Sequence, residues 1–254
     1  MKAALFQQDI VWGSPESNRR RLDGVLESTQ EAELYVFPEM FTTGFATEED
    51  SVVEESDAAA IEWMLSWSRR KNAAIAGSVA LRNGKKCVNR LLFVTPDGKV
   101  VSYDKRHLFS YGGEDRRFCA GRERVIAEAG GCRFLLAVCY DLRFPVWLRN
   151  RGDYDAILLV ANWPDVRMPA WDTLSRARAI ENQCYVLACN RVGKDPACNY
   201  SGGTKIINPY GETVSDVPDA TEGWACGDID MDFLCACAKK FPVLESADSF
   251  EMLV

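Results

Sequence analysis

Short apolar runs alternate with longer amphipathic stretches along almost the whole chain. The apolar runs are bounded by turn residues and predict buried strands in residues 2–8, 32–40, 73–81, 89–98, 99–109, 124–141, 154–164, 184–193, 202–216 and 222–233. The amphipathic stretches repeat apolar residues every three or four positions and predict helices over residues 14–29, 56–70 and 169–183, with a short helix beginning near Pro145. Strands and helices that alternate in this way are typical of an α/β domain.

Two tight turns decide how some of these strands pair. Pro96-Asp97-Gly98 joins consecutive strands as a hairpin, and Gly130-Gly131 makes a second hairpin of residues 124–141. Hairpins give antiparallel pairs, so a purely parallel sheet is disfavoured and one or two mixed sheets are expected. The pattern contains no linker, repeat or low-complexity break, which indicates a single domain over residues 1–254. The run 222–233 closes the set, and the tail after Phe241 reads as short and irregular.

Charge and hydropathy exclude several classes of protein. The chain of 254 residues carries a formal net charge of −7 and lacks the basic stripe that a nucleic-acid binder needs. No polybasic cluster suits an anionic membrane, and no apolar window approaches the length of a transmembrane helix. The apolar run at the N-terminus is too short for a signal peptide. We therefore expect a cytoplasmic protein without a nucleic-acid or membrane partner.

The ten cysteines do not form a metal-binding pattern. Several, such as Cys132 and Cys184, lie inside apolar runs, where cysteine usually acts as a small buried hydrophobe. No Cys-x-x-Cys occurs, Cys235 and Cys237 are too close for the usual zinc spacing, and the chain has one histidine. The sequence predicts no metal site.

Cys139 differs from the other cysteines in its position. It follows the apolar run 134–138 directly and precedes the helix expected near Pro145. A corner between a strand and a helix exposes a side chain at the sheet edge, and the helix N-terminus is expected to lower the pKa of a thiol there. Position and charged neighbours leave two interpretations about equal: a nucleophile, or a buried structural cysteine.

A nucleophilic cysteine needs a base or a cation, because a free thiol with a pKa of about 8.5 is mostly protonated at pH 7. The one histidine, His107, is the only candidate for a Cys-His pair or a Ser-His-Asp triad, and the Gly-x-Ser-x-Gly motif is missing. A carboxylate is therefore the better base. Glu39 ends the run 32–40 among apolar residues, where desolvation makes a carboxylate a better proton acceptor; the alternative is an exposed loop glutamate.

Lys105 ends a third strand, in the segment "VSYDKRHLF". An ammonium group near Cys139 would favour the thiolate and would stabilise a tetrahedral oxyanion. Taken alone, Lys105 reads equally well as a solvated surface lysine.

Three strands thus end in Glu39, Lys105 and Cys139, and in this the sequence resembles the nitrilase superfamily of carbon–nitrogen hydrolases. "FPEMFTTGF" resembles the glutamate motif of that family, "YDKRHLF" the lysine motif and "CYDLRFP" the cysteine motif. The resemblance implies a four-layer αββα sandwich with mixed sheets, usually assembled as a dimer through the cysteine-bearing side. It also implies Cys139 as nucleophile, Glu39 as general base and Lys105 as stabiliser of the oxyanion, without a metal or organic cofactor.

Three other residues follow from the resemblance and from the expected turn at the cysteine. Glu114 matches a second glutamate of the family, between the lysine and the cysteine, and is expected to orient the amide or Lys105. The backbone N–H of Tyr140 is expected to be the second oxyanion donor. His107 is expected to pack and hydrogen-bond behind Lys105, outside the chemistry.

Within the superfamily the motifs are most similar to the ω-amidase branch, whose members hydrolyse the terminal amide of 2-oxoglutaramate or 2-oxosuccinamate to a dicarboxylate and ammonia. Such an anionic substrate needs a cation, and Arg143 is the candidate for binding its carboxylate. The alternative for Arg143 is an ion pair with Asp141 or with a dimer partner. Aromatic residues are expected either to wall the pocket or to belong to the core, namely Phe41, Phe109, Tyr111 and Trp163.

Other functions stay open at this point. An N-carbamoyl amide hydrolase and a true nitrilase would use the same three residues. A catalytically silent scaffold of the same fold predicts the loss of one of them, yet all three are present. A thiol redox sensor predicts a cysteine whose reversible oxidation switches function, and no paired spacing of cysteines supports it.

Overall fold

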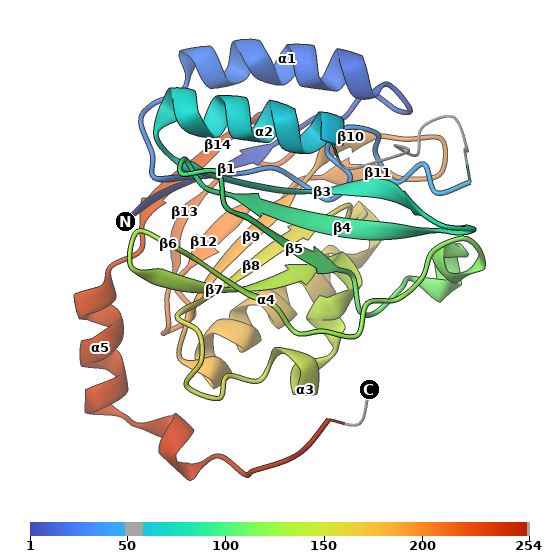
Figure 1. Cartoon of the computed structure of the whole chain (residues 1–254). Helices are drawn as coiled ribbons and strands as arrows, with labels where there is room; N and C mark the ends of the chain where they lie inside the picture. The colour runs from blue at the N-terminus through green and yellow to red at the C-terminus, as the bar shows by residue number, and fades with distance from the viewer. Residues whose placement is uncertain (49–57, 253–254) are drawn as a thin grey trace.

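The computed structural model describes residues 1–48 and 58–252 and contains two six-stranded mixed sheets that lie face to face (Figure 1). The first sheet has the order β14-β1-β2-β3-β4-β5, with strands Lys2–Gln7 (β1), Leu34–Val36 (β2), Ala74–Asn83 (β3), Lys86–Val94 (β4), Val100–Asp104 (β5) and Gly223–Asp228 (β14). The second has the order β13-β12-β9-β8-β7-β6, with strands Ile126–Ala129 (β6), Cys132–Val138 (β7), Ala156–Ala161 (β8), Tyr185–Asn190 (β9), Lys205–Ile207 (β12) and Thr213–Asp216 (β13).

Helices cover the outer face of each sheet and complete four layers. The helices Pro15–Ser28 (α1) and Ala58–Lys71 (α2) lie over the first sheet, and Pro145–Leu148 (α3) and Met168–Asn182 (α4) lie against the second (Figure 1). The expected αββα sandwich with mixed sheets is therefore confirmed. The first two residues of the helix expected over 56–70 lie outside the described residues. No described helix has the length and apolar character needed to span a bilayer.

The largest hydrophobic core fills the space between the two sheets. Strands β7, β8 and β9 run parallel and are buried on both faces, by the other sheet and by α4, which explains their unbroken apolar runs. Phe93 of the first sheet and Phe134 of the second meet with ring centroids 5.8 Å apart. Contact of this kind fixes the two sheets, and therefore their edges, relative to each other.

Both predicted hairpins are present: β4 pairs with β5, and β6 with β7, antiparallel. The sequence did not predict helix Met231–Lys240 (α5) or the small hairpin Val192–Lys194 (β10) with Asn199–Ser201 (β11). Asp230 begins α5 by accepting a hydrogen bond from the Phe233 N–H at 2.9 Å. The first residues of this helix, Met231–Phe233, were assigned to the preceding strand, which ends at Asp228.

The packing at Gly77 gives a test of the first sheet. A Cβ atom on Gly77 would lie 2.8 Å from Cδ1 of the buried Phe41 ring, so we expect Gly77→Ala to lower the free energy of unfolding by about 1–3 kcal/mol through overpacking. Gly24 in α1 has no atom within 4 Å of that position, and Gly24→Ala should raise stability by up to about 1 kcal/mol. Urea unfolding of both variants measures the difference, and equal effects would contradict this packing.

Candidate active site

Four side chains that the sequence singled out meet at one edge of the sandwich. Glu39, Lys105 and Glu114 are fully buried, and Cys139 is 9% exposed. Lys105 Nζ lies 2.9 Å from Glu39 Oε1 and 2.9 Å from Glu114 Oε2. The two carboxylates and the thiol thus surround one ammonium group.

Glu39 is held from three directions after strand β2. Its Oε1 accepts from Asn89 Nδ2 at 2.7 Å, and its Oε2 accepts from the backbone N–H of Asn162 at 2.8 Å. Asn162 Nδ2 also donates to the Glu39 carbonyl oxygen at 2.7 Å, while Ser78 Oγ donates to Asn89 Oδ1 at 2.8 Å. These contacts fix the carboxylate before any substrate binds.

Lys105 continues directly from β5 and lies between the two carboxylates. Burial would lower the pKa of Lys105, but the negative charges of Glu114 and Glu39 outweigh it and raise that pKa. Burial also raises the pKa of Glu114, against the effect of Lys105. Glu114 Oε2 accepts a hydrogen bond from the Phe109 N–H at 2.6 Å. The loop that carries Glu114 therefore also holds its carboxylate in place.

Cys139 lies at a sharp turn between β7 and the short 3₁₀ helix Cys139–Arg143. Its φ of +46° falls in the left-handed region, which a residue with a side chain adopts at some cost in strain. Asp141 secures the turn. Its Oδ2 accepts from the Val138 N–H at 2.9 Å and from Tyr103 Oη at 2.8 Å.

His107 binds this turn from outside. Its backbone N–H donates to Asp141 Oδ1 at 3.0 Å, its Nδ1 lies 2.8 Å from the same oxygen, and its ring stacks on Phe144 at 3.7 Å. The contacts of His107 are therefore with the cysteine turn rather than with Lys105. Asp141 is occupied by these donors, and the guanidinium of Arg143 stacks on the Trp163 ring instead. The suggested ion pair between Arg143 and Asp141 is therefore wrong.

The thiol of Cys139 is not activated in the way the sequence suggested. The sequence led us to expect that a helix N-terminus lowers its pKa. Instead, burial and then the Glu39 charge raise the pKa of Cys139 well above its ordinary value, against the opposing effect of Lys105. The resting thiol is protonated, and the neighbouring Glu39 carboxylate is the group able to accept its proton.

A cavity of about 70 Å³ opens beside Cys139. Its walls contain predicted residues, namely Lys105, Phe109, Cys139, Tyr140, Arg143 and Trp163, together with residues that the sequence reading missed, namely Phe45, Asn162, Pro164, Arg167, Cys198 and Tyr200. Asn162 could have been found from the sequence, because parallel neighbours β7 and β8 must end at the same edge. A space of this size suits the end of a small molecule.

Two aromatic residues predicted to wall the pocket do not line it. Phe41 is fully buried in a separate core, against Phe37 at 5.5 Å and Trp63 at 5.8 Å between ring centroids. Tyr111 is 87% exposed and contacts the rim through Phe109, 5.8 Å away. Phe41 belongs to the same core as Tyr35 and Phe37, on the side of the first sheet that the helices cover.

Comparison with known proteins agrees with this architecture. The family model for carbon-nitrogen hydrolases matches residues 2–239, so the chain belongs to the carbon-nitrogen hydrolase family. It is 44% identical to Omega-amidase YafV of Yersinia enterocolitica over 100% of this chain and 99% of that protein. It is 32% identical to 2-oxoglutaramate amidase of Bacillus subtilis (strain 168), over 94% of this chain and 95% of that one.

A solved structure is also close to this one. XC1258 from Xanthomonas campestris, described as a CN-hydrolase superfamily protein with an arsenic adduct in the active site, superimposes with a TM-score of 0.95 at 41% identity, covering 99% of this chain and 98% of that chain. The chain is accordingly a hydrolase of carbon–nitrogen bonds other than peptide bonds.

The buried charge cluster predicts how stability depends on Lys105. Lys105→Met leaves two buried carboxylates without a cation, and we expect a loss of about 3–5 kcal/mol in the free energy of unfolding. Burial and Glu39 raise the pKa of Glu114, and without the ammonium only the hydrogen bond from the Phe109 N–H opposes them. The folded state then binds more protons than the unfolded state, so the loss grows as pH rises from 5 to 8.

Urea unfolding at both pH values measures this effect. The double variant Lys105→Met/Glu114→Gln, which removes one carboxylate as well, should regain part of the lost stability. A loss independent of pH, with no recovery in the double variant, would show that the charges do not interact as the distances imply.

Proposed function

We propose that the protein is an ω-amidase that hydrolyses the terminal amide of 2-oxoglutaramate or 2-oxosuccinamate to a dicarboxylate and ammonia. The observation that carries the proposal is the buried contact of Glu39, Lys105 and Cys139 beside a small cavity with a guanidinium in its wall. The names of the relatives from Yersinia enterocolitica and Bacillus subtilis support the same substrate class.

The first half of the reaction forms a thioester. Glu39 accepts the proton of Cys139, and the thiolate attacks the amide carbon. Lys105 Nζ and the Tyr140 backbone N–H donate hydrogen bonds to the oxygen that becomes negatively charged. Glu39 then returns the proton to the nitrogen, the C–N bond breaks and ammonia leaves.

The second half releases the acid. Glu39 deprotonates a water molecule, which attacks the thioester carbon; the C–S bond breaks, and the proton returns to the Cys139 sulfur. Glu114 acts through Lys105, whose ammonium it holds at 2.9 Å. No step requires a cofactor or a metal.

Arg143 is proposed to bind the substrate carboxylate. Its Cζ lies 4.9 Å from the centroid of the Trp163 ring, in the wall of the cavity. A guanidinium stacked on a ring keeps its N–H groups free to bind a carboxylate with two hydrogen bonds.

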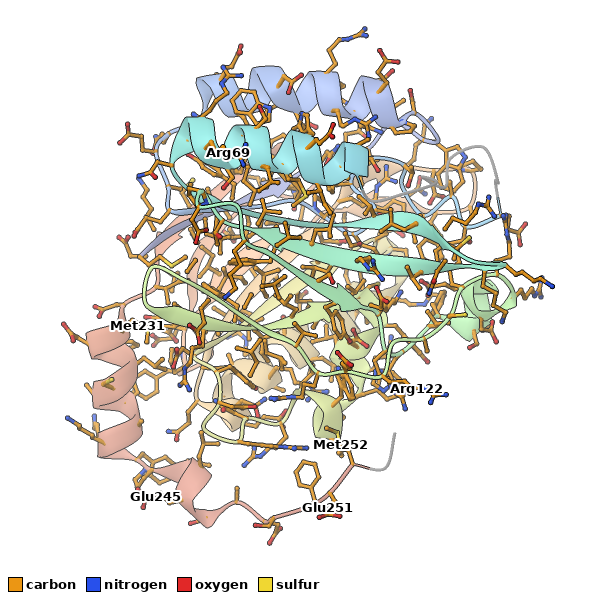
Figure 2. The ribbon with its side chains drawn as sticks, viewed as in Figure 1. Arg69, Arg122, Met231, Glu245, Glu251 and Met252 are labelled. Atoms are coloured by element: carbon orange, nitrogen blue, oxygen red, sulfur yellow. The ribbon has the colours of Figure 1, made fainter. Side chains whose placement is uncertain are left out.

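We also propose a cytoplasmic, single-domain enzyme that forms a homodimer through the face of α3 and α4. Ten free thiols suit a reducing compartment. Exposed apolar side chains on and beside that face support association, namely Val146 and Ile180, and Met252 of the C-terminal tail lies near α3 (Figure 2).

Light scattering of the purified protein should give the mass of two chains. The Ile180→Asp variant should shift the measured mass toward that of one chain.

Ammonia release tests the function directly. Wild-type protein should release ammonia from 2-oxoglutaramate and 2-oxosuccinamate, and Cys139→Ala should lose at least about a thousandfold of this activity, because removal of a nucleophile leaves only binding and the oxyanion donors. Release that persists in Cys139→Ala would remove this cysteine from the mechanism. If the wild type acts instead on a carbamoyl amino acid or a nitrile, the substrate class is wrong.

A further inference from the structure

The cavity beside Cys139 contains a second guanidinium that the proposed mechanism does not use. Arg167 lines it together with Arg143, and neither side chain makes a hydrogen bond or ion pair with any residue in the ranges 1–48 and 58–252. Other partly buried arginines have such partners: Arg90 and Arg133 pair with Asp104 and Asp155. Arg106 and Arg149 donate to backbone carbonyl oxygens. Within the part of the chain that the structure describes, the two cavity arginines lack such partners, and both line the same small cavity.

Aromatic rings fix both guanidiniums in place. Arg167 Cζ lies 5.1 Å from the centroid of the Phe109 ring, and Arg143 Cζ lies 4.9 Å from that of Trp163. The Trp163 indole N–H donates to the Arg167 carbonyl oxygen at 2.8 Å, so the two arginines are connected through one tryptophan. Stacking supports the faces of the guanidiniums, and their N–H edges have no acceptor among the residues that the structure describes.

Two unpaired positive charges on one cavity repel each other, so this arrangement favours an anion. One carboxylate has two oxygens, which accept two parallel hydrogen bonds from one guanidinium group. The second guanidinium group therefore needs another acceptor close to that carboxylate. The 2-oxo oxygen of a 2-oxo acid is such an acceptor, whereas the 2-ammonium group of an amino acid would add a third positive charge.

We propose that Arg167 is a specificity-determining residue that donates hydrogen bonds to the 2-oxo oxygen of the substrate, while Arg143 binds the carboxylate. The inference rests on the proposed function and extends it, because a donor to the 2-oxo oxygen would select 2-oxo amides over amides that carry a 2-ammonium group. The apolar surroundings supplied by Phe109 and Trp163 strengthen both interactions by excluding water.

A pair of amides that differ by one oxygen tests this assignment. Glutaramate lacks only the 2-oxo oxygen of 2-oxoglutaramate. In Arg167→Gln the ratio of kcat/KM between 2-oxoglutaramate and glutaramate should fall about 10- to 100-fold, the range for a lost charge-assisted hydrogen bond, mainly through KM. Arg143→Gln should weaken both amides together.

The matched control is Arg122→Gln, which removes the same charge from an exposed arginine at the edge of the molecule (Figure 2). It should leave the ratio at the wild-type value. An Arg167→Gln protein that keeps the wild-type ratio, or that loses both substrates equally, overturns the assignment of Arg167.

Binding separates this inference from the proposed function. Calorimetry with Cys139→Ala should show tighter binding of 2-oxoglutaramate than of glutaramate, and adding Arg167→Gln should remove the difference. If the wild type releases no ammonia but this difference appears and disappears as stated, the amidase proposal fails and the Arg167 site stands. If Cys139→Ala binds the two amides equally, the Arg167 assignment is wrong whatever the turnover.

Discussion

The site depends on one buried ammonium group that is shared between two carboxylates. Lys105 lies 2.9 Å from Glu39 and 2.9 Å from Glu114, and all three side chains are fully buried. A buried charge is tolerated only when it is paired and hydrogen-bonded, so none of the three can move far without exposing the others to the same cost. The cluster therefore joins strand ends β2 and β5 to the loop of Glu114 in one fixed geometry.

This geometry also determines the chemistry available to Cys139. With both carboxylates ionised, a thiolate would add a further negative charge to a dry site, and its raised pKa reflects that cost. Passing the proton to Glu39 leaves the total charge unchanged, because one negative charge moves from carboxylate to sulfur. In the proposed mechanism the nucleophile therefore forms by internal proton transfer, whereas a cysteine activated by a helix N-terminus would need no neighbouring base.

Much of this arrangement could be predicted from the sequence, because strand ends are easy to locate. Glu39, Lys105 and Cys139 each follow an apolar run, and parallel strands in a sandwich end at a common edge. Asn89 and Ser78, which orient Glu39, were missed, although each is a polar residue inside a buried strand and therefore needs a buried partner. Phe41 was misplaced because it lies close to Glu39 in the sequence, yet its ring packs with Tyr35 and Phe37 in the core on the helix side of the first sheet.

Arg167 could not be identified from sequence alone, since its proposed role depends on the lack of an ion pair with residues 1–48 and 58–252 in three dimensions. An arginine after a turn normally reads as a solvated surface residue. Here it shares a cavity with Arg143 and Cys139, and the two guanidiniums face a space whose other walls are largely aromatic. If only the stability of the fold mattered, each of the two guanidinium groups would be expected to have an aspartate or glutamate beside it. In the proposal, the negative charge that both guanidiniums lack among the described residues arrives with the substrate. Glu39, Lys105 and Cys139 then act on one end of that molecule and the two arginines on the other.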